Sequence, residues 1–405
     1  QTAANDGERG IALGLTGDIQ VMSGDPTNGR KTFEQALEVL NRAAAADPAV
    51  SATPRTLSRP DGKAPDLTKK VKVFILMGQS NMVGMGDIDP QDRPGTLSYL
   101  VRVVKRYPFL IDEAGRWTVR RDVYYYDARL KKGSFLTATS NGRSIGPELG
   151  FGFVMGEVLD EPVLVLKSCI GNRSLGWDLL PPGSPRFSAA VVERTGESVM
   201  KVFAGYGDRP ASWVMDPAKG LATEPPPWLD PKTGKPVDWY AGKQYDIDLA
   251  NAKAALTNLA GIYPDYKGAG YEIAGFVWWQ GHKDQNAVYA ARYEENLARL
   301  IIALRRDYGA PSAKFVLATG CGNPGREGFG LQIAEAQLAI GDTARHPEFA
   351  GTVKAVDTRD LWRDASVSPK NQSYHYNRNA ETYLETGLRL GWAMAELLRG
   401  GPTNR

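Results

Sequence analysis

The sequence has few cysteines and few histidines. Only Cys169 and Cys321 occur among 405 residues, too few for a disulfide framework, so cysteine usage does not indicate the redox compartment. The three histidines are His282, His346 and His375. Any mechanism that uses an imidazole base must therefore draw on one of these three side chains.

The sequence also lacks a strong excess of charge of one sign and any long apolar run. Lys and Arg number 49 against 46 Asp and Glu, which leaves a net charge of +3. That charge, spread over this length, is too weak to indicate a nucleic-acid partner. No apolar run reaches the roughly 18 residues of a spanning helix. The N-terminus has no basic-then-apolar signal pattern, so an exported chain would already have lost its signal.

The remaining composition is that of an ordinary folded protein, with 42% hydrophobic and 23% charged residues. Residues 1–69 read as an N-terminal extension, with one amphipathic helix over about 31–46 and a Ser/Pro-rich linker over 49–69. The main domain is expected over 70–400. A Pro- and Trp-rich stretch over about 207–245 reads as a surface insertion.

Within the main domain, short apolar runs alternate with longer stretches of helical periodicity. The predicted strands cover residues 71–77, 163–168, 273–279, 314–319 and 352–357. The predicted helices cover 146–159, 248–260, 288–306, 331–340 and 379–398. This alternation predicts an α/β fold of three layers, α/β/α, in which helices cover both faces of a central parallel sheet.

Ligands of such sheets bind beyond the carboxyl ends of the strands, so the residues that follow each strand are the candidates for chemistry. Ser80 follows the first predicted strand, where its hydroxyl can be exposed and its own N–H can face an oxyanion. A serine at this position is equally typical of a helix N-cap. The local pattern leaves both interpretations open.

The other strand ends carry further candidates. Gly171 lies in a turn of small residues after the second strand, where its backbone can approach a ligand. Gln280 follows the third strand and offers a neutral amide donor, with His282 nearby as a surface or packing residue and Asp284 as a helix cap. His375 lies in the loop before the terminal helix, where a lone histidine is more often structural than catalytic.

Together these segments resemble the SGNH (GDSL-like) hydrolase superfamily. The nearest branch is the group of sialate O-acetylesterases and acetylxylan esterases, carbohydrate esterase family 6 and its relatives. The resemblance covers roughly residues 70–400 and rests on Gly78-Gln79-Ser80-Asn81-Met82, Ile170-Gly171, Trp279-Gln280-Gly281 with Asp284, and His375 before Asn379-Ala380.

The resemblance implies a flavodoxin-like sheet and a set of catalytic roles. It makes Ser80 the nucleophile and His375 the general base. It forms the oxyanion hole from the N–H groups of Ser80 and Gly171 and the side-chain amide of Gln280. The implied reaction is a two-step acyl transfer through an acetyl-serine, for which no metal or cofactor is needed.

Three positions depart from the pattern of this branch. Its members usually carry an Asp three residues before the catalytic histidine, where this sequence has Gln372. The base would then be oriented by a backbone carbonyl, by water, or by an acid from elsewhere, with Asp360 and Asp364 as the nearest upstream candidates. His282 stands where the branch commonly has Glu, and Asn172 stands where a second glycine is frequent.

The substrate expected from the resemblance is an acetylated carbohydrate. The tryptophans of the insertion could offer flat faces to pyranose rings, or could simply pack the insertion onto the core. Asn81, Arg143 and Arg173 are predicted to bind substrate, and the two arginines could hold the carboxylate of a sialic or uronic acid or be merely solvated.

The leading hypothesis is a serine esterase that removes O-acetyl groups from a sugar or polysaccharide. One alternative is a glycan-binding relative that has lost catalysis, as the residue at position 372 suggests. Another is a lipase or thioesterase on the same scaffold. The substrate class favours a secreted or periplasmic protein, and the sequence does not indicate an oligomeric state.

Overall fold

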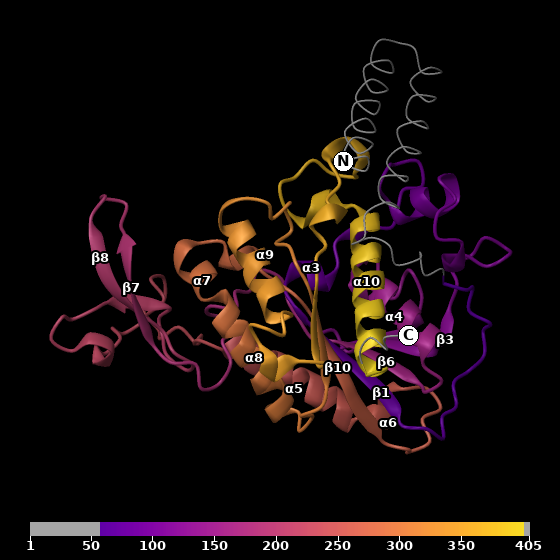
Figure 1. Cartoon of the computed structure of the whole chain (residues 1–405), viewed down its shortest axis with the longest axis horizontal. Helices are drawn as coiled ribbons and strands as arrows, with labels where there is room; N and C mark the ends of the chain where they lie inside the picture. Colours follow the sequence, from indigo (N-terminus) through magenta and orange to yellow (C-terminus); the bar gives the residue numbers. More distant parts are fainter. Residues whose placement is uncertain (1–56, 401–405) are drawn as a thin grey trace, which may run out of the picture. The chain divides into compact units, whose positions relative to one another are not determined.

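The computed structural model describes residues 57–400, so the helix predicted over 31–46 lies outside the described residues. Figure 1 shows a twisted central sheet with helices on both of its faces. The sheet is built from β1 (Val71–Gly78), β3 (Arg120–Asp127), β4 (Lys132–Leu136), β6 (Val163–Lys167), β10 (Tyr271–Trp279), β11 (Lys314–Ala318) and β12 (Val353–Val356).

The order of strands in the sheet is β12-β11-β10-β1-β6-β3-β4, and every neighbouring pair is parallel except β3 with β4. Five of these strands match the five predicted from apolar runs. Numbered along the chain, those five lie in the order 2-1-3-4-5, which is the flavodoxin-like arrangement. The predicted fold class is confirmed.

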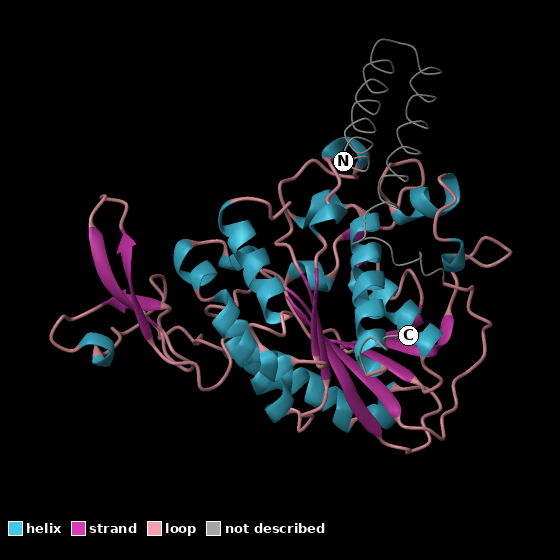
Figure 2. Cartoon of the chain, viewed as in Figure 1, coloured by secondary structure: helices cyan, strands magenta, loops and turns pink. Residues whose placement is uncertain are grey.

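Helices cover both faces of the sheet (Figure 2). The main helices are α3 (Ser80–Val83), α4 (Pro147–Val158), α5 (Lys243–Thr257), α6 (Leu259–Ile262), α7 (Ala287–Ala291), α8 (Tyr293–Asp307), α9 (Gly328–Ile340) and α10 (Ala380–Leu398). Helices α5, α8 and α9 share one hydrophobic core with the odd-numbered residues of β1. Helices α4 and α10 pack together, with α4 on β3 and β6 and α10 on β11 and β12. Among residues 57–400, none of these helices has the length and apolar character to span a bilayer.

Single helical turns complete the connections. They cover Tyr99–Val103, Pro108–Leu110, Gly220–Ala222, His282–Asp284, Pro347–Phe349, Arg359–Leu361, Ala365–Val367 and His375–Arg378. The last three of these turns lie in the loop between β12 and α10.

Several short strands were not anticipated. β2 (Gly86–Asp87) pairs with β5 (Ser144–Ile145), and a separate sheet contains β7 (Phe187–Val192), β8 (Ser198–Phe203) and β9 (Ser212–Val214). This second sheet lies away from the central one (Figure 1) and begins before residue 207, where the insertion was predicted to start. Its strands are short and half-exposed, so they lack the continuous apolar runs that marked the buried strands.

β1 lies between β6 and β10, where the chain order of the strands reverses and where such sheets bind ligands. The last residue of β1 must be a glycine for the strands to approach there. Gly78 has φ +150°, and a Cβ at this position would lie 2.2 Å from the carbonyl oxygen of Trp279. This close contact places the residues after β1 directly beside those after β10.

Candidate active site

Ser80 and His375 form a hydrogen-bonded pair at the carboxyl end of β1. The Ser80 hydroxyl lies 2.8 Å from Nε2 of His375, although the two residues are 295 positions apart in the sequence. Ser80 is the first residue of α3, so its own N–H has no acceptor within the helix. Its side chain does not cap the helix, because Gln79 occupies the N-cap position. Of the two interpretations of Ser80, the geometry favours a nucleophile paired with a base.

The imidazole is presented by a left-handed turn. The φ angles of His375, Tyr376, Asn377 and Arg378 are 52°, 47°, 53° and 60°, so four consecutive residues other than glycine occupy the left-handed region. This conformation costs roughly 1–2 kcal/mol per residue, so the surrounding structure must hold it in place.

Contacts with four parts of the chain hold the turn. The N–H of Tyr376 donates to the carbonyl of Gly322 at 3.1 Å, and its ring stacks on Trp279 at 5.4 Å between centroids. The Asn377 amide donates to the carbonyl of Arg363 at 3.0 Å. The Arg378 guanidinium donates to Asp87 at 2.8 Å. These contacts explain how a strained turn can carry a fixed imidazole.

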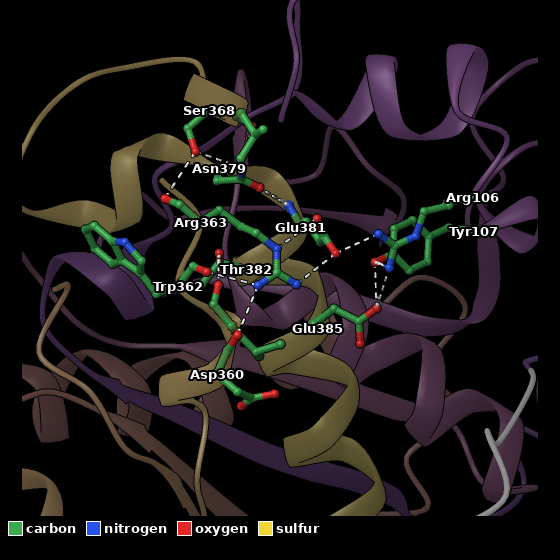
Figure 3. A network of polar contacts seen from close by, with 12 residues as sticks. Arg106, Tyr107, Asp360, Trp362, Arg363, Ser368, Asn379, Glu381, Thr382 and Glu385 are labelled. Carbon is green, nitrogen blue, oxygen red and sulfur yellow. Dashed lines mark hydrogen bonds and ion pairs between the residues drawn. The ribbon is translucent and has the colours of Figure 1, made fainter. Parts of the chain in front are cut away.

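A charged network supports the same loop from the side of α10 (Figure 3). The carboxylate of Glu381 accepts from Arg106 at 2.6 Å and from Arg363 at 3.1 Å. Burial alone would raise the pKa of Glu381, but the two guanidinium groups outweigh burial and hold that pKa below its ordinary value. These ion pairs fix Arg363, whose backbone carbonyl accepts the hydrogen bond from the Asn377 side-chain amide.

The predicted orienting acids are not in contact with His375. Asp360 pairs with Arg389 at 2.6 Å, and Asp364 accepts from the indole N–H of Trp362 at 2.9 Å. The expectation that one of them orients the base is wrong, because both carboxylates point to other partners. Within residues 57–400, the Ser80 hydroxyl is the one hydrogen-bond partner of the His375 ring. The serine and histidine therefore form a dyad in this part of the chain.

The pKa of His375 is lowered from its ordinary value to about 4. Burial of the ring is the main cause, and electrostatic repulsion by His282, when it is protonated, and by Arg378 adds to it. The imidazole is thus neutral near pH 7, the form that can accept the proton of a serine hydroxyl. His346 lies elsewhere, paired with Glu294 and Glu348. Of the three histidines, His375 is the one whose ring is hydrogen-bonded to the Ser80 hydroxyl within residues 57–400.

Gly171 lies directly beside Ser80. A Cβ on Gly171 would be 3.4 Å from the Cβ of Ser80, and within residues 57–400 its N–H donates to no other group. Asn172 adopts φ 58°, a left-handed conformation that asparagine tolerates better than most residues. The turn therefore keeps the backbone shape that a second glycine would allow.

The amide of Gln280 lies near the pair but is already engaged. Its Nε2 donates to Asp284 at 2.5 Å, to the carbonyl of Arg173 at 2.9 Å and to Gln79 at 3.1 Å. Three acceptors thus share two hydrogens. For Gln280 to stabilise an oxyanion, one of these bonds would have to open, and that role stays a prediction.

Residues 232–396 match the family model for "Carbohydrate esterase, sialic acid-specific acetylesterase". The matched segment is less than half of the chain. The match includes Gln280 and His375, whereas Ser80 precedes it and joins the site through the fold. The resemblance identified from the motifs is confirmed, and the family indicates a carbohydrate acetylesterase.

Comparison with solved structures finds distant likenesses. A protein from Arabidopsis thaliana is 15% identical with a TM-score of 0.46, over 80% of this chain and 98% of that one. A carbohydrate acetylesterase from Xanthomonas citri is 13% identical with a TM-score of 0.43, over 82% and 57%. NanS is 13% identical with a TM-score of 0.44, over 83% and 99%. A search of curated proteins finds no match.

The three residues predicted to bind substrate lie in different settings. Asn81 is buried and accepts from the Tyr383 hydroxyl at 3.0 Å. Arg143 is exposed on the loop before β5. The Arg173 guanidinium donates to Gln244 at 3.0 Å and stacks on Trp239 of the insertion at 4.8 Å. These contacts fix the side chain of Arg173, which lies two positions after Gly171 in the sequence. Among residues 57–400, no three His, Cys, Asp or Glu side chains gather in a way that could hold a metal ion.

Behind Arg173 lies a buried carboxyl group with incomplete hydrogen bonding. Asp248 is 1% exposed; its Oδ1 accepts from Gln244 at 2.8 Å, whereas its Oδ2 has no partner among the described residues. Burial raises the pKa of Asp248 to about 8. The folded protein therefore holds this proton, which the unfolded chain loses near pH 4.

Asp248→Asn is expected to stabilise the protein at alkaline pH. Because the folded pKa is the higher one, the aspartate's contribution to stability is present at low pH and is lost as pH rises toward 8. Asparagine does not ionise, so the Asp248→Asn protein does not lose this stability. Its free energy of unfolding should exceed that of the wild type by a few kcal/mol at pH 9. Urea unfolding at pH 5 and pH 9 checks this, and an equal difference at both values would contradict it.

Proposed function

We propose that the protein is a serine carbohydrate esterase that removes O-acetyl groups through an acetyl-serine intermediate. The observation that carries the proposal is the 2.8 Å contact between the Ser80 hydroxyl and Nε2 of His375, at the point where the strand order reverses. The family of residues 232–396 supports a carbohydrate ester as the substrate.

In the first step, His375 takes the hydroxyl proton while Ser80 Oγ attacks the acetyl carbonyl carbon. Gly171 lies beside Ser80, and we assign the N–H groups of these two residues to the negative oxygen of the tetrahedral intermediate. Collapse of the intermediate breaks the ester bond, and protonated His375 gives its proton to the leaving sugar oxygen. Ser80 then carries the acetyl group.

In the second step, neutral His375 takes a proton from water, and the resulting hydroxide attacks the acetyl-serine. The new intermediate expels the Ser80 oxygen, which takes the proton back from His375, and acetic acid leaves. A dyad can perform both steps, because the general base needs to be neutral and within hydrogen-bond reach, and His375 meets both conditions.

The lack of a carboxylate on His375 favours one competing function, a glycan-binding protein without turnover. The two functions differ in their products. Purified protein should be incubated with O-acetylated sialic acid, acetylated xylo-oligosaccharides and 4-nitrophenyl esters of two to twelve carbons, and acetate or nitrophenol measured.

The esterase proposal predicts turnover of acetyl esters that declines with acyl chain length. Glycan binding without any release of acetate would contradict the esterase and support the competing function. Activity that rises with chain length would instead indicate a lipase or thioesterase.

A further inference from the structure

Asp284 is a fully buried carboxylate that joins two loops of the site. It follows β10, is 0% exposed, and accepts from the backbone N–H of Leu175 at 2.9 Å and of Gly176 at 2.7 Å. It also accepts from the side-chain amide of Gln280 at 2.5 Å. The sequence predicted a helix cap here, but the side chain that caps the following helix α7 is Asn286.

The Leu175 and Gly176 amides belong to the same loop as Gly171. That loop follows β6, whereas Gln280 and Asp284 follow β10, and both loops reach the end of β1 from opposite sides. The Gly171 N–H has no hydrogen-bond acceptor among the described residues, so its direction depends on what fixes the rest of its loop. Asp284 supplies two of those fixing bonds from across the site.

We infer that Asp284 is a positioning residue that holds the loop of Gly171 in the geometry needed to stabilise the oxyanion. This inference rests on the proposed function, because it assigns a role within the same reaction. Hydrogen bonds to an ionised carboxylate are roughly twice as strong as neutral ones. Three of them therefore hold the loop after β6 and the loop after β10 firmly in place.

The protonation state of Asp284 is consistent with this role. Burial raises the pKa of Asp284 to about 6, while the Gln280 amide and the Gly176 and Leu175 N–H groups limit the rise. The group is therefore ionised at neutral pH and can accept from all three donors. A protonated carboxyl would place a hydrogen against one of them.

The test compares Asp284→Asn with the wild type on 4-nitrophenyl acetate. Asparagine has the same shape but offers one acceptor oxygen and a competing NH₂ group, so the loop should loosen without loss of volume. We expect kcat to fall about 30-fold, within the range seen when oxyanion stabilisation is weakened, and KM to stay within about threefold. Asp248→Asn, which changes another buried Asp in the same way, should keep kcat within about twofold.

A second readout separates positioning from general loss of structure. Methylboronic acid forms a tetrahedral adduct on a nucleophilic serine and so reports the geometry of the oxyanion hole. Its inhibition constant should rise in Asp284→Asn by the same factor by which kcat falls, whereas a smaller folded fraction would leave that constant unchanged. Thermal unfolding gives the folded fraction, and the more conservative Asp284→Glu serves if the asparagine variant does not fold.

The outcomes are distinct. Unchanged kcat in Asp284→Asn, or lower kcat with an unchanged boronate constant, overturns the inference and leaves the esterase intact. If the wild type itself releases no acetate and binds no boronate, the proposed function fails and the inference fails with it.

Discussion

Replacing Ser80 with alanine is expected to lower kcat for acetate release by at least about 10³-fold, because the variant has no oxygen to form the acyl-enzyme. The fold should be unaffected, since the hydroxyl's hydrogen bond is with His375 and no helix cap is lost. The measurement is steady-state turnover of the best acetyl substrate, with thermal unfolding as a check of the fold.

Ser168→Ala is a suitable matched control. Ser168 is buried just after β6, where its hydroxyl donates to the backbone carbonyl of Asp248 at 2.7 Å, away from the His375 ring. The variant should keep kcat within about threefold. Equal losses in the two serine variants, or near-normal turnover in Ser80→Ala, would show that Ser80 is not the nucleophile.

The second large effect is expected in the pH profile of kcat/KM. The base must be neutral to act, and the pKa of His375 is about 4, so activity should persist to lower pH than an ordinary histidine with a pKa near 6.5 allows. Below pH 4 the rate should fall about tenfold per pH unit. His375→Gln should lose at least about 10³-fold in kcat at every pH.

A shallower decline should precede that fall. Protonation of Asp284, whose pKa is about 6, weakens the hydrogen bonds between the loops that follow β6 and β10. The value of kcat/KM should therefore begin to decline near pH 6. Asp284→Asn should lose this shallower decline and keep the steep limb near pH 4. A single steep limb near pH 6.5 in both proteins would contradict the assignment of the lowered pKa to His375.

The same low pKa affects folding. Since the folded protein releases the His375 proton more readily than the unfolded chain, the unfolded chain binds more protons between about pH 4 and 6.5. Stability therefore falls as pH drops through that window. Enzyme assays at low pH need a parallel measurement of the folded fraction.

The sequence was most informative where strands are buried on both faces. The run that became β1 is apolar without interruption because helices cover the sheet on both sides, so its position could be predicted closely. β3 was missed because it carries Arg120, Arg121 and Asp122 at its start, which interrupt the apolar pattern. The strands of the second sheet were missed because they are short and half-exposed.

For the site, chemistry could be predicted and geometry could not. Residue types at strand ends pointed to Ser80 and Gly171, and the family resemblance added His375. The fold places both Gly171 and His375 beside Ser80. The partners of Asp284 are backbone N–H groups more than a hundred positions earlier, and backbone donors leave no mark in a sequence. The left-handed turn at His375 was equally hidden, because its residues are not glycines.

The central claim is that Ser80 is the nucleophile that carries the acyl group during turnover, and covalent labelling of that nucleophile tests it most directly. The protein should be treated with a fluorophosphonate at pH 7, and the intact mass and the labelled peptide determined by mass spectrometry. We predict one label per chain, on Ser80, formed at least about 10²-fold more slowly in His375→Gln. Labelling at another residue, or equal rates with and without the imidazole, would contradict the account.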